Sequence, residues 1–261
     1  MSDVPLEPQS TRVDMHDVTW DDERVTRFWD FMSQTSSGEY FSSKHAQEIA
    51  SEILRRISPV GIVADVGCGG GHLLRALMDR GIDIVGVDSS PTSIEWAREQ
   101  LPDAPIEALQ VGSMTALPLA DESVDTVALI EVVEHALDWD LDRIFSEARR
   151  VLRRGGHIFI TTRNAEDLAR EMVMCPDCGA VFHRMQHVRS WSPLTLSHAL
   201  TVAGFEAVTC RALRFVGPSG FVERNMRRLY YRLTDRRPDL IAVARRPTSP
   251  DTAETGPRSD G

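Results

Sequence analysis

The sequence is poor in lysine and in basic charge overall. Lys44 is the only lysine, every other basic side chain is arginine, and the formal net charge is -10 at pH 7. Nonspecific binding to nucleic acid requires clustered basic side chains that neutralise phosphates. The acidic total therefore argues against a broad nucleic-acid surface, and nucleic acid is not an expected partner.

Targeting segments and long apolar runs are also missing. The first residues lack a basic region followed by an apolar stretch, and no run of about 18 apolar residues occurs. These absences predict a cytoplasmic protein without a membrane partner. Cysteine is sparse as well, with Cys68, Cys175, Cys178 and Cys210. In a reducing compartment, four cysteines favour thiols or metal ligands over a disulfide framework.

Large apolar side chains are scarce at both ends of the chain. Residues 1–18 and 247–261 cannot offset their ordering entropy by burial, which predicts two disordered tails. Residues 19–58 carry apolar side chains at helical spacing and predict an N-terminal helical cap. Residues 59–246 alternate short apolar runs with helical segments, as is typical of a parallel sheet with helices on both faces. An insertion at 166–191 interrupts that alternation after the fifth predicted strand.

A glycine-rich loop follows the first of these predicted strands. Asp65 ends the strand, and the loop reads Gly67-Cys68-Gly69-Gly70-Gly71. Open α/β sheets bind ligands at the carboxyl ends of their strands, where glycine lets the backbone turn tightly and approach the ligand. Asp88 ends the next strand, and its carboxylate can accept both ribose hydroxyls. His72 stands where a dinucleotide fingerprint requires Gly or Ala, which disfavours a dehydrogenase.

With these motifs the sequence resembles the class I S-adenosylmethionine-dependent methyltransferases over about residues 59–165. ADVGCGGG, VGVDSS and GSMTALPLADESVDTV carry the resemblance. It implies a Rossmann-like α/β fold with a seven-stranded, mostly parallel sheet, and S-adenosyl-L-methionine as cofactor. The family commonly has Asp where this chain has Ser113. The cofactor-binding residues that the resemblance implies are Asp65, Gly67, Cys68, Gly69, Asp88, Ser89, Ser113, Met114 and Glu131.

Two acids and a histidine follow the fourth predicted strand. Glu131, Glu134 and His135 would share one face of a helical turn and could hold a divalent metal ion such as Mg2+. This cluster resembles those of the quinone-biosynthesis O-methyltransferases and the small-RNA 2′-O-methyltransferases. The second resemblance implies that His187 completes the metal site. Without a metal, His135 is the first candidate for a general base, and Glu131 and Glu134 are further catalytic candidates.

The insertion offers a competing metal site. Cys175, Cys178, His183 and His187 are spaced as C-x2-C-x4-H-x3-H, a pattern typical of Zn2+ binding. A structural zinc ion would explain how so short an insertion is ordered. His187 cannot easily serve both sites, so the zinc-type and the catalytic-metal interpretations both remain open. A third interpretation is a pair of thiols that bind no metal.

The leading functional hypothesis is methyl transfer from S-adenosylmethionine to a small-molecule acceptor, with a hydroxyl oxygen as the favoured methylated atom and possible metal assistance. The first alternative is an RNA 2′-O-methyltransferase, which uses the same cluster but requires a basic groove along the strand. The second is a non-catalytic module that binds the cofactor or is stabilised by zinc, because a fold does not prove an activity.

Overall fold

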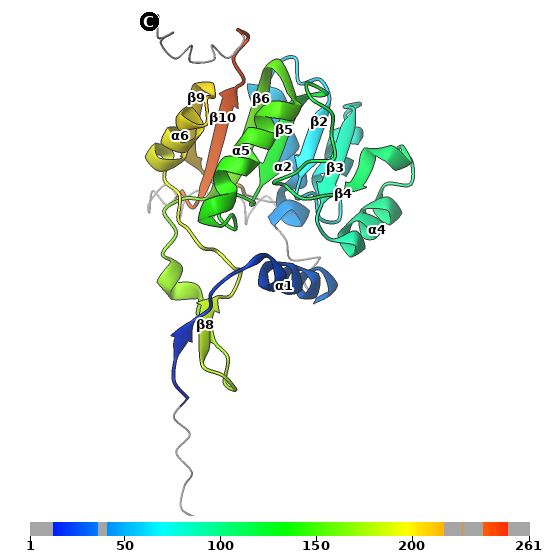
Figure 1. Cartoon of the computed structure of the whole chain (residues 1–261). Helices are drawn as coiled ribbons and strands as arrows, with labels where there is room; N and C mark the ends of the chain where they lie inside the picture. Colours follow the sequence, from blue (N-terminus) through cyan, green and yellow to red (C-terminus); the bar gives the residue numbers. More distant parts are fainter. Residues whose placement is uncertain (1–12, 36–40, 217–225, 227–236, 250–261) are drawn as a thin grey trace, which may run out of the picture.

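A computed structural model describes residues 13–35, 41–216, 226 and 237–249, and its centre is a seven-stranded sheet (Figure 1). The strands are β2 (Val63–Val66), β3 (Ile84–Asp88), β4 (Leu109–Val111), β5 (Val124–Ile130), β6 (Leu152–Arg163), β9 (Glu206–Leu213) and β10 (Asp239–Arg245). Their order across the sheet is β4-β3-β2-β5-β6-β10-β9. Neighbours from β4 to β6 are parallel, whereas β10 runs antiparallel to both β6 and β9. The predicted mostly parallel α/β sheet is confirmed.

Helices cover both faces of this sheet. α2 (Phe41–Arg56), α3 (His72–Met78) and α4 (Pro91–Gln100) cover one face, and α5 (Asp138–Val151) and α6 (Pro193–Val202) cover the other. α1 (Asp22–Thr35) has no buried residue and lies below the sheet in Figure 1. Two short 3-10 turns are η2 (Ile106–Ala108) and η3 (Leu168–Glu171). α4 begins where the hydroxyl of Ser90 accepts a hydrogen bond from the backbone of Ser93, with Pro91 at the first helical position. Among the described helices, none is both long enough and apolar enough to cross a membrane.

The alternation of side chains along β5 divides the core into two layers. Val127 and Leu129 face the layer that holds Phe145 of α5, whereas Ala128 and Ile130 face the layer under α2, α3 and α4. Successive strand residues point to opposite faces, so a strand covered on both sides is apolar throughout. Burial on both faces fixes the strand, and therefore fixes the position of the residues that follow its carboxyl end.

A second, three-stranded sheet projects from this body (Figure 1). β7 (Met172–Met174) and β8 (Ala180–His183) form an antiparallel hairpin within the insertion, and β1 (His16–Asp17) pairs in parallel with β8. β1 shows that residues 16 and 17 of the tail predicted at 1–18 form a strand, whereas residues 1–12 lie outside the described residues. Backbone hydrogen bonds order residues 16–18, from His16 N to Gly179 O (3.1 Å) and from Val18 N to Val181 O (3.0 Å). The prediction of a tail rested on amino-acid composition, which carries no information about backbone pairing with a distant strand. Most of the other predicted tail lies outside the described residues.

The two buried layers predict that substitution by alanine lowers stability very differently at two phenylalanines. Phe159 of β6 is fully buried, whereas Phe31 of α1 is 62% exposed. Phe159→Ala should lower the free energy of unfolding by about 3–5 kcal/mol, because it removes buried ring contacts and leaves a cavity. Phe31→Ala should change it by less than about 0.5 kcal/mol. Urea denaturation of both variants tests this, and equal losses would contradict the layer assignment.

Candidate functional site

The glycine loop lies between the ends of β2 and β3. Asp88 accepts hydrogen bonds from Gly69 N and Ser90 N, each at 2.9 Å, so the loop itself orients the carboxylate. Gly69 has a φ of +51°, and no atom lies within 4 Å of the position where its Cβ would be. At Gly70 a Cβ would come within 2.1 Å of the Trp96 ring. The loop therefore requires glycine at both positions, once for backbone conformation and once for packing.

A cavity of about 640 Å³ runs from this loop to the end of β5. Six of the predicted cofactor-binding residues line it, namely Gly67, Gly69, Asp88, Ser89, Met114 and Glu131. The other three do not. Asp65 and Cys68 are buried beneath the loop, and the exposed Ser113 hydroxyl is hydrogen-bonded to Thr115 at 2.8 Å.

Asp65 is the most unusual acid beneath the loop. Its side chain is 3% exposed, and Oδ1 has no hydrogen-bond partner. Burial, reinforced by the Asp88 carboxylate, raises the pKa of Asp65 to about 7. A positively charged group near Asp65 would reverse that shift, so the buried acid favours a cationic ligand at the loop.

The turn after β5 separates the three residues of the acid-acid-histidine cluster. Glu131 has a φ of +52°, and its carboxylate accepts a hydrogen bond from the Thr161 hydroxyl at 2.9 Å. Burial raises the pKa of Glu131 to about 7, although the Thr161 bond opposes the shift. One helix-like turn follows, closed by a bond from His135 N to Val132 O at 3.1 Å. Glu131 therefore does not join Glu134 and His135 in one group of potential metal ligands, although its carboxylate lies close enough to raise the pKa of Glu134.

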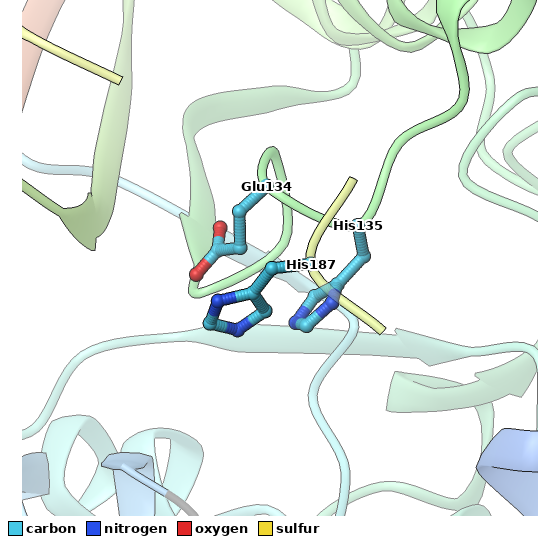
Figure 2. A group of neighbouring side chains, drawn as sticks. All are labelled: Glu134, His135 and His187. Atoms are coloured by element: carbon cyan, nitrogen blue, oxygen red, sulfur yellow. The ribbon is translucent and has the colours of Figure 1, made fainter. Parts of the chain in front are cut away.

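Glu134 and His135 instead meet His187 from the insertion, and Figure 2 shows the three side chains converging. One potential ligand atom from each lies within 4.8 Å of the others. Glu134 is 1% exposed, and neither carboxylate oxygen has a hydrogen-bond partner. Burial and the nearby Glu131 raise the pKa of Glu134, whereas burial and His187 lower the pKa of His135 to about 3. An unpaired buried carboxylate beside neutral imidazoles fits a divalent cation.

A second group surrounds the other side of His187. Its Nδ1 lies 2.5 Å from Glu166 Oε2, and His183 Nε2 lies 4.0 Å from Glu166 Oε1. Burial would raise the pKa of Glu166, but the hydrogen bond to His187 lowers it below its ordinary value. The sequence motifs did not identify Glu166. The available signal was its position three residues beyond the end of β6, at the edge of the sheet where ligands bind.

The predicted zinc site is not assembled, because its two histidines lie together but its two cysteines do not join them. Cys175 and Cys178 lie in the turn between β7 and β8, whereas His183 ends β8. An extended strand rises about 3.3 Å per residue, so β8 carries the histidine away from the cysteines. Among the described residues, no group of three potential ligands within 4.8 Å includes either cysteine. Hydrogen bonds from the backbone of Cys178 and Asp177 do lower the pKa of the Cys175 thiol.

Comparisons with known proteins agree with the loop and the sheet. Residues 64–160 match the family model of the methyltransferase domain. The chain is 31% identical over 144 residues to a Mycolicibacterium smegmatis protein named as an S-adenosylmethionine-dependent methyltransferase, a match covering 55% of this chain and 51% of that protein. It is 36% identical over 104 residues to a ubiquinone biosynthesis O-methyltransferase of Mesorhizobium japonicum, covering 39% of this chain and 41% of that protein. The chain thus matches about half or less of each relative's length.

A solved structure extends the likeness to most of the chain. It is phosphoethanolamine N-methyltransferase 2 of Haemonchus contortus in complex with S-adenosyl-L-methionine, with a TM-score of 0.57 and 17% identity. The match covers 84% of this chain and 60% of that one. At this identity the likeness shows the fold alone.

Asp65→Asn should stabilise the ligand-free protein in a pH-dependent way. The folded pKa of about 7 exceeds the ordinary 3.8, so the native state binds more protons between these values and wild-type stability falls as pH rises through them. The gain in the free energy of unfolding from Asp65→Asn should therefore be small at pH 4 and reach about 4 kcal/mol at pH 8. Urea denaturation across this range, with the exposed Asp103→Asn as control, tests it. A stability gain of Asp65→Asn that does not change with pH would contradict the raised pKa of Asp65.

Proposed function

The chain belongs to the S-adenosylmethionine-dependent methyltransferases, and from this premise we propose that it methylates a hydroxyl oxygen of a small molecule with the help of a divalent metal ion. One observation carries the proposal. A single cavity joins the glycine loop and Asp88 to His135 and His187, beside the buried and unpaired carboxylate of Glu134. Methyl donor and metal-activated acceptor would meet in that cavity.

The loop end of the cavity suits the donor. Asp88 is held by two backbone N–H groups and keeps lone pairs for the ribose hydroxyls. Asp65 offers a buried negative charge beneath the cationic methionine part of the cofactor. The bound cofactor supplies the sulfonium methyl group, and the protein contributes alignment of that group with the acceptor oxygen.

The other end suits a metal ion and an acceptor oxygen. Glu134, His135 and His187 would supply one carboxylate and two imidazoles, a donor set that favours a transition metal such as Zn2+ over the oxygen-preferring Mg2+. Such an ion would lower the pKa of an acceptor hydroxyl and orient its oxygen. Because burial lowers the pKa of His135 to about 3, this ring is a better metal ligand than proton acceptor.

Oxygen as the methylated atom rests on the cluster and on one group of relatives. The Mesorhizobium japonicum relative is named an O-methyltransferase, and its match spans 104 residues. The net charge of -10 continues to weigh against RNA as the acceptor. A screen of hydroxylated metabolites with cofactor carrying a labelled methyl group would identify the acceptor, and salt-sensitive methylation of RNA would overturn the small-molecule proposal.

Cofactor affinity should depend on Asp88. Asp88→Ala should weaken S-adenosylmethionine binding about 10–100-fold, because it removes charge-assisted hydrogen bonds worth roughly 1.5–3 kcal/mol. Asp83→Ala changes an exposed acid just before the same strand and should leave the affinity unchanged. Isothermal titration calorimetry measures both variants. Wild-type protein that fails to bind millimolar cofactor would overturn the proposed function.

Metal content should depend on Glu134 and not on the cysteine turn. Glu134→Gln should lose bound metal and turnover but keep cofactor affinity, because it removes a charged ligand that lies beside His135 and His187, away from the glycine loop. Cys178→Ser, in the exposed turn between β7 and β8, should keep both metal and turnover. Elemental analysis and labelled-methyl turnover measure these outcomes, with thermal denaturation to check folding. Zinc lost only from the cysteine variant, or turnover insensitive to EDTA, would contradict metal assistance by Glu134.

A further inference from the structure

Glu166 belongs to no motif in the sequence, yet it lies between two histidines of the insertion. Its carboxylate is mostly buried, with 13% of the side chain exposed. Oε2 lies 2.5 Å from His187 Nδ1, and Oε1 lies 4.0 Å from His183 Nε2. Hydrogen bonding around this carboxylate decides which nitrogen of each ring carries a proton.

His183 has its tautomer set by the backbone. Its Nδ1 accepts hydrogen bonds from Met185 N at 3.3 Å and from His187 N at 3.2 Å, so Nδ1 carries no proton. The single proton of the neutral ring then resides on Nε2, which is buried without a hydrogen-bond partner and faces Glu166. A neutral imidazole binds a metal through an unprotonated nitrogen, so His183 Nε2 keeps its proton, 4.0 Å from Glu166 Oε1, and is not a metal ligand.

His187 has the opposite arrangement. An ionised carboxylate only accepts hydrogen bonds, so the short contact with Glu166 requires the proton on His187 Nδ1. Nε2 is left with its lone pair. The His187 side chain lines the cavity and belongs to the group with Glu134 and His135, so Nε2, the nitrogen that Glu166 does not engage, would be the ligand atom for the proposed metal ion.

We propose that Glu166 is a positioning residue that fixes His187 in the Nδ1–H tautomer and thereby presents Nε2 to the metal ion. The inference rests on the proposed function and deepens its metal site. Carboxylates that accept the second N–H of a metal-bound histidine raise the basicity of the ligand and hold its ring, and losing one typically costs 10–100-fold in metal affinity. The insertion would then supply a ligand together with the carboxylate that orients it.

The tautomers can be read without metal, cofactor or acceptor. Side-chain 15N NMR of metal-free wild-type protein should show His187 protonated at Nδ1 and His183 protonated at Nε2. Glu166→Ala should abolish the preference at His187, whereas Glu166→Gln retains an acceptor oxygen and should preserve it. Asp167→Ala, an exposed neighbouring acid, should change neither ring. His187 protonated at Nε2 in the wild-type protein would overturn the inference.

Co2+ binding, followed by its visible absorption, provides the second readout. Glu166→Ala should weaken Co2+ binding about 10–100-fold, Glu166→Gln should fall between that variant and wild type, and Asp167→Ala should match wild type. Wild-type protein that binds no Co2+ would overturn the proposed metal assistance. Wild-type protein that binds Co2+, with Glu166→Ala equally tight, would overturn only the role of Glu166.

Discussion

The unpaired carboxylate of Glu134 is the constraint on which the rest of the site depends. An ionised carboxylate in the protein interior costs several kcal/mol unless hydrogen bonds or a cation compensate it. Glu134 has neither among the described residues, and Glu131 lies close enough to raise its pKa further. A proton or a metal ion must balance this group, and the imidazoles of His135 and His187 beside it favour the metal ion.

Two residues beside Glu134, His135 and His187 have an unusual backbone conformation. Glu131 and Gln186 both have positive φ angles, 52° and 57°, which side-chain-bearing residues rarely adopt. Gln186 is fully buried, accepts a hydrogen bond from Trp29 Nε1 at 3.0 Å and donates one to His135 O at 3.1 Å. It thereby ties α1 and the insertion to the turn after β5. Strained residues of this kind persist only where surrounding contacts over-determine them, and they cluster at functional sites.

The fold and the donor end of the site could be predicted from sequence because both depend on local patterns. Strand-helix alternation indicated the sheet, and glycines followed by the strand-end Asp88 indicated the loop. The end of the cavity at His135 and His187 depends on a hairpin, which a sequence pattern does not reveal. The spacing of Cys175, Cys178, His183 and His187 indicated one zinc site, whereas the cysteines lie in a turn and His183 ends the strand that follows it. Glu166 was missed because its contact with His187 exists only once that hairpin has folded back.

The hairpin also connects His187 to the first described strand of the chain. His187 and Glu166 flank the hairpin of β7 and β8, and β8 is paired with β1 near the N-terminus. Val188 N donates to the backbone oxygen of Glu134 at 3.0 Å, so the hairpin is also fastened to the turn after β5. A ligand that binds only the assembled site stabilises everything that must fold to form it. A metal ion on Glu134, His135 and His187 would therefore stabilise the small sheet as well as the cavity, although β1 contributes no ligand.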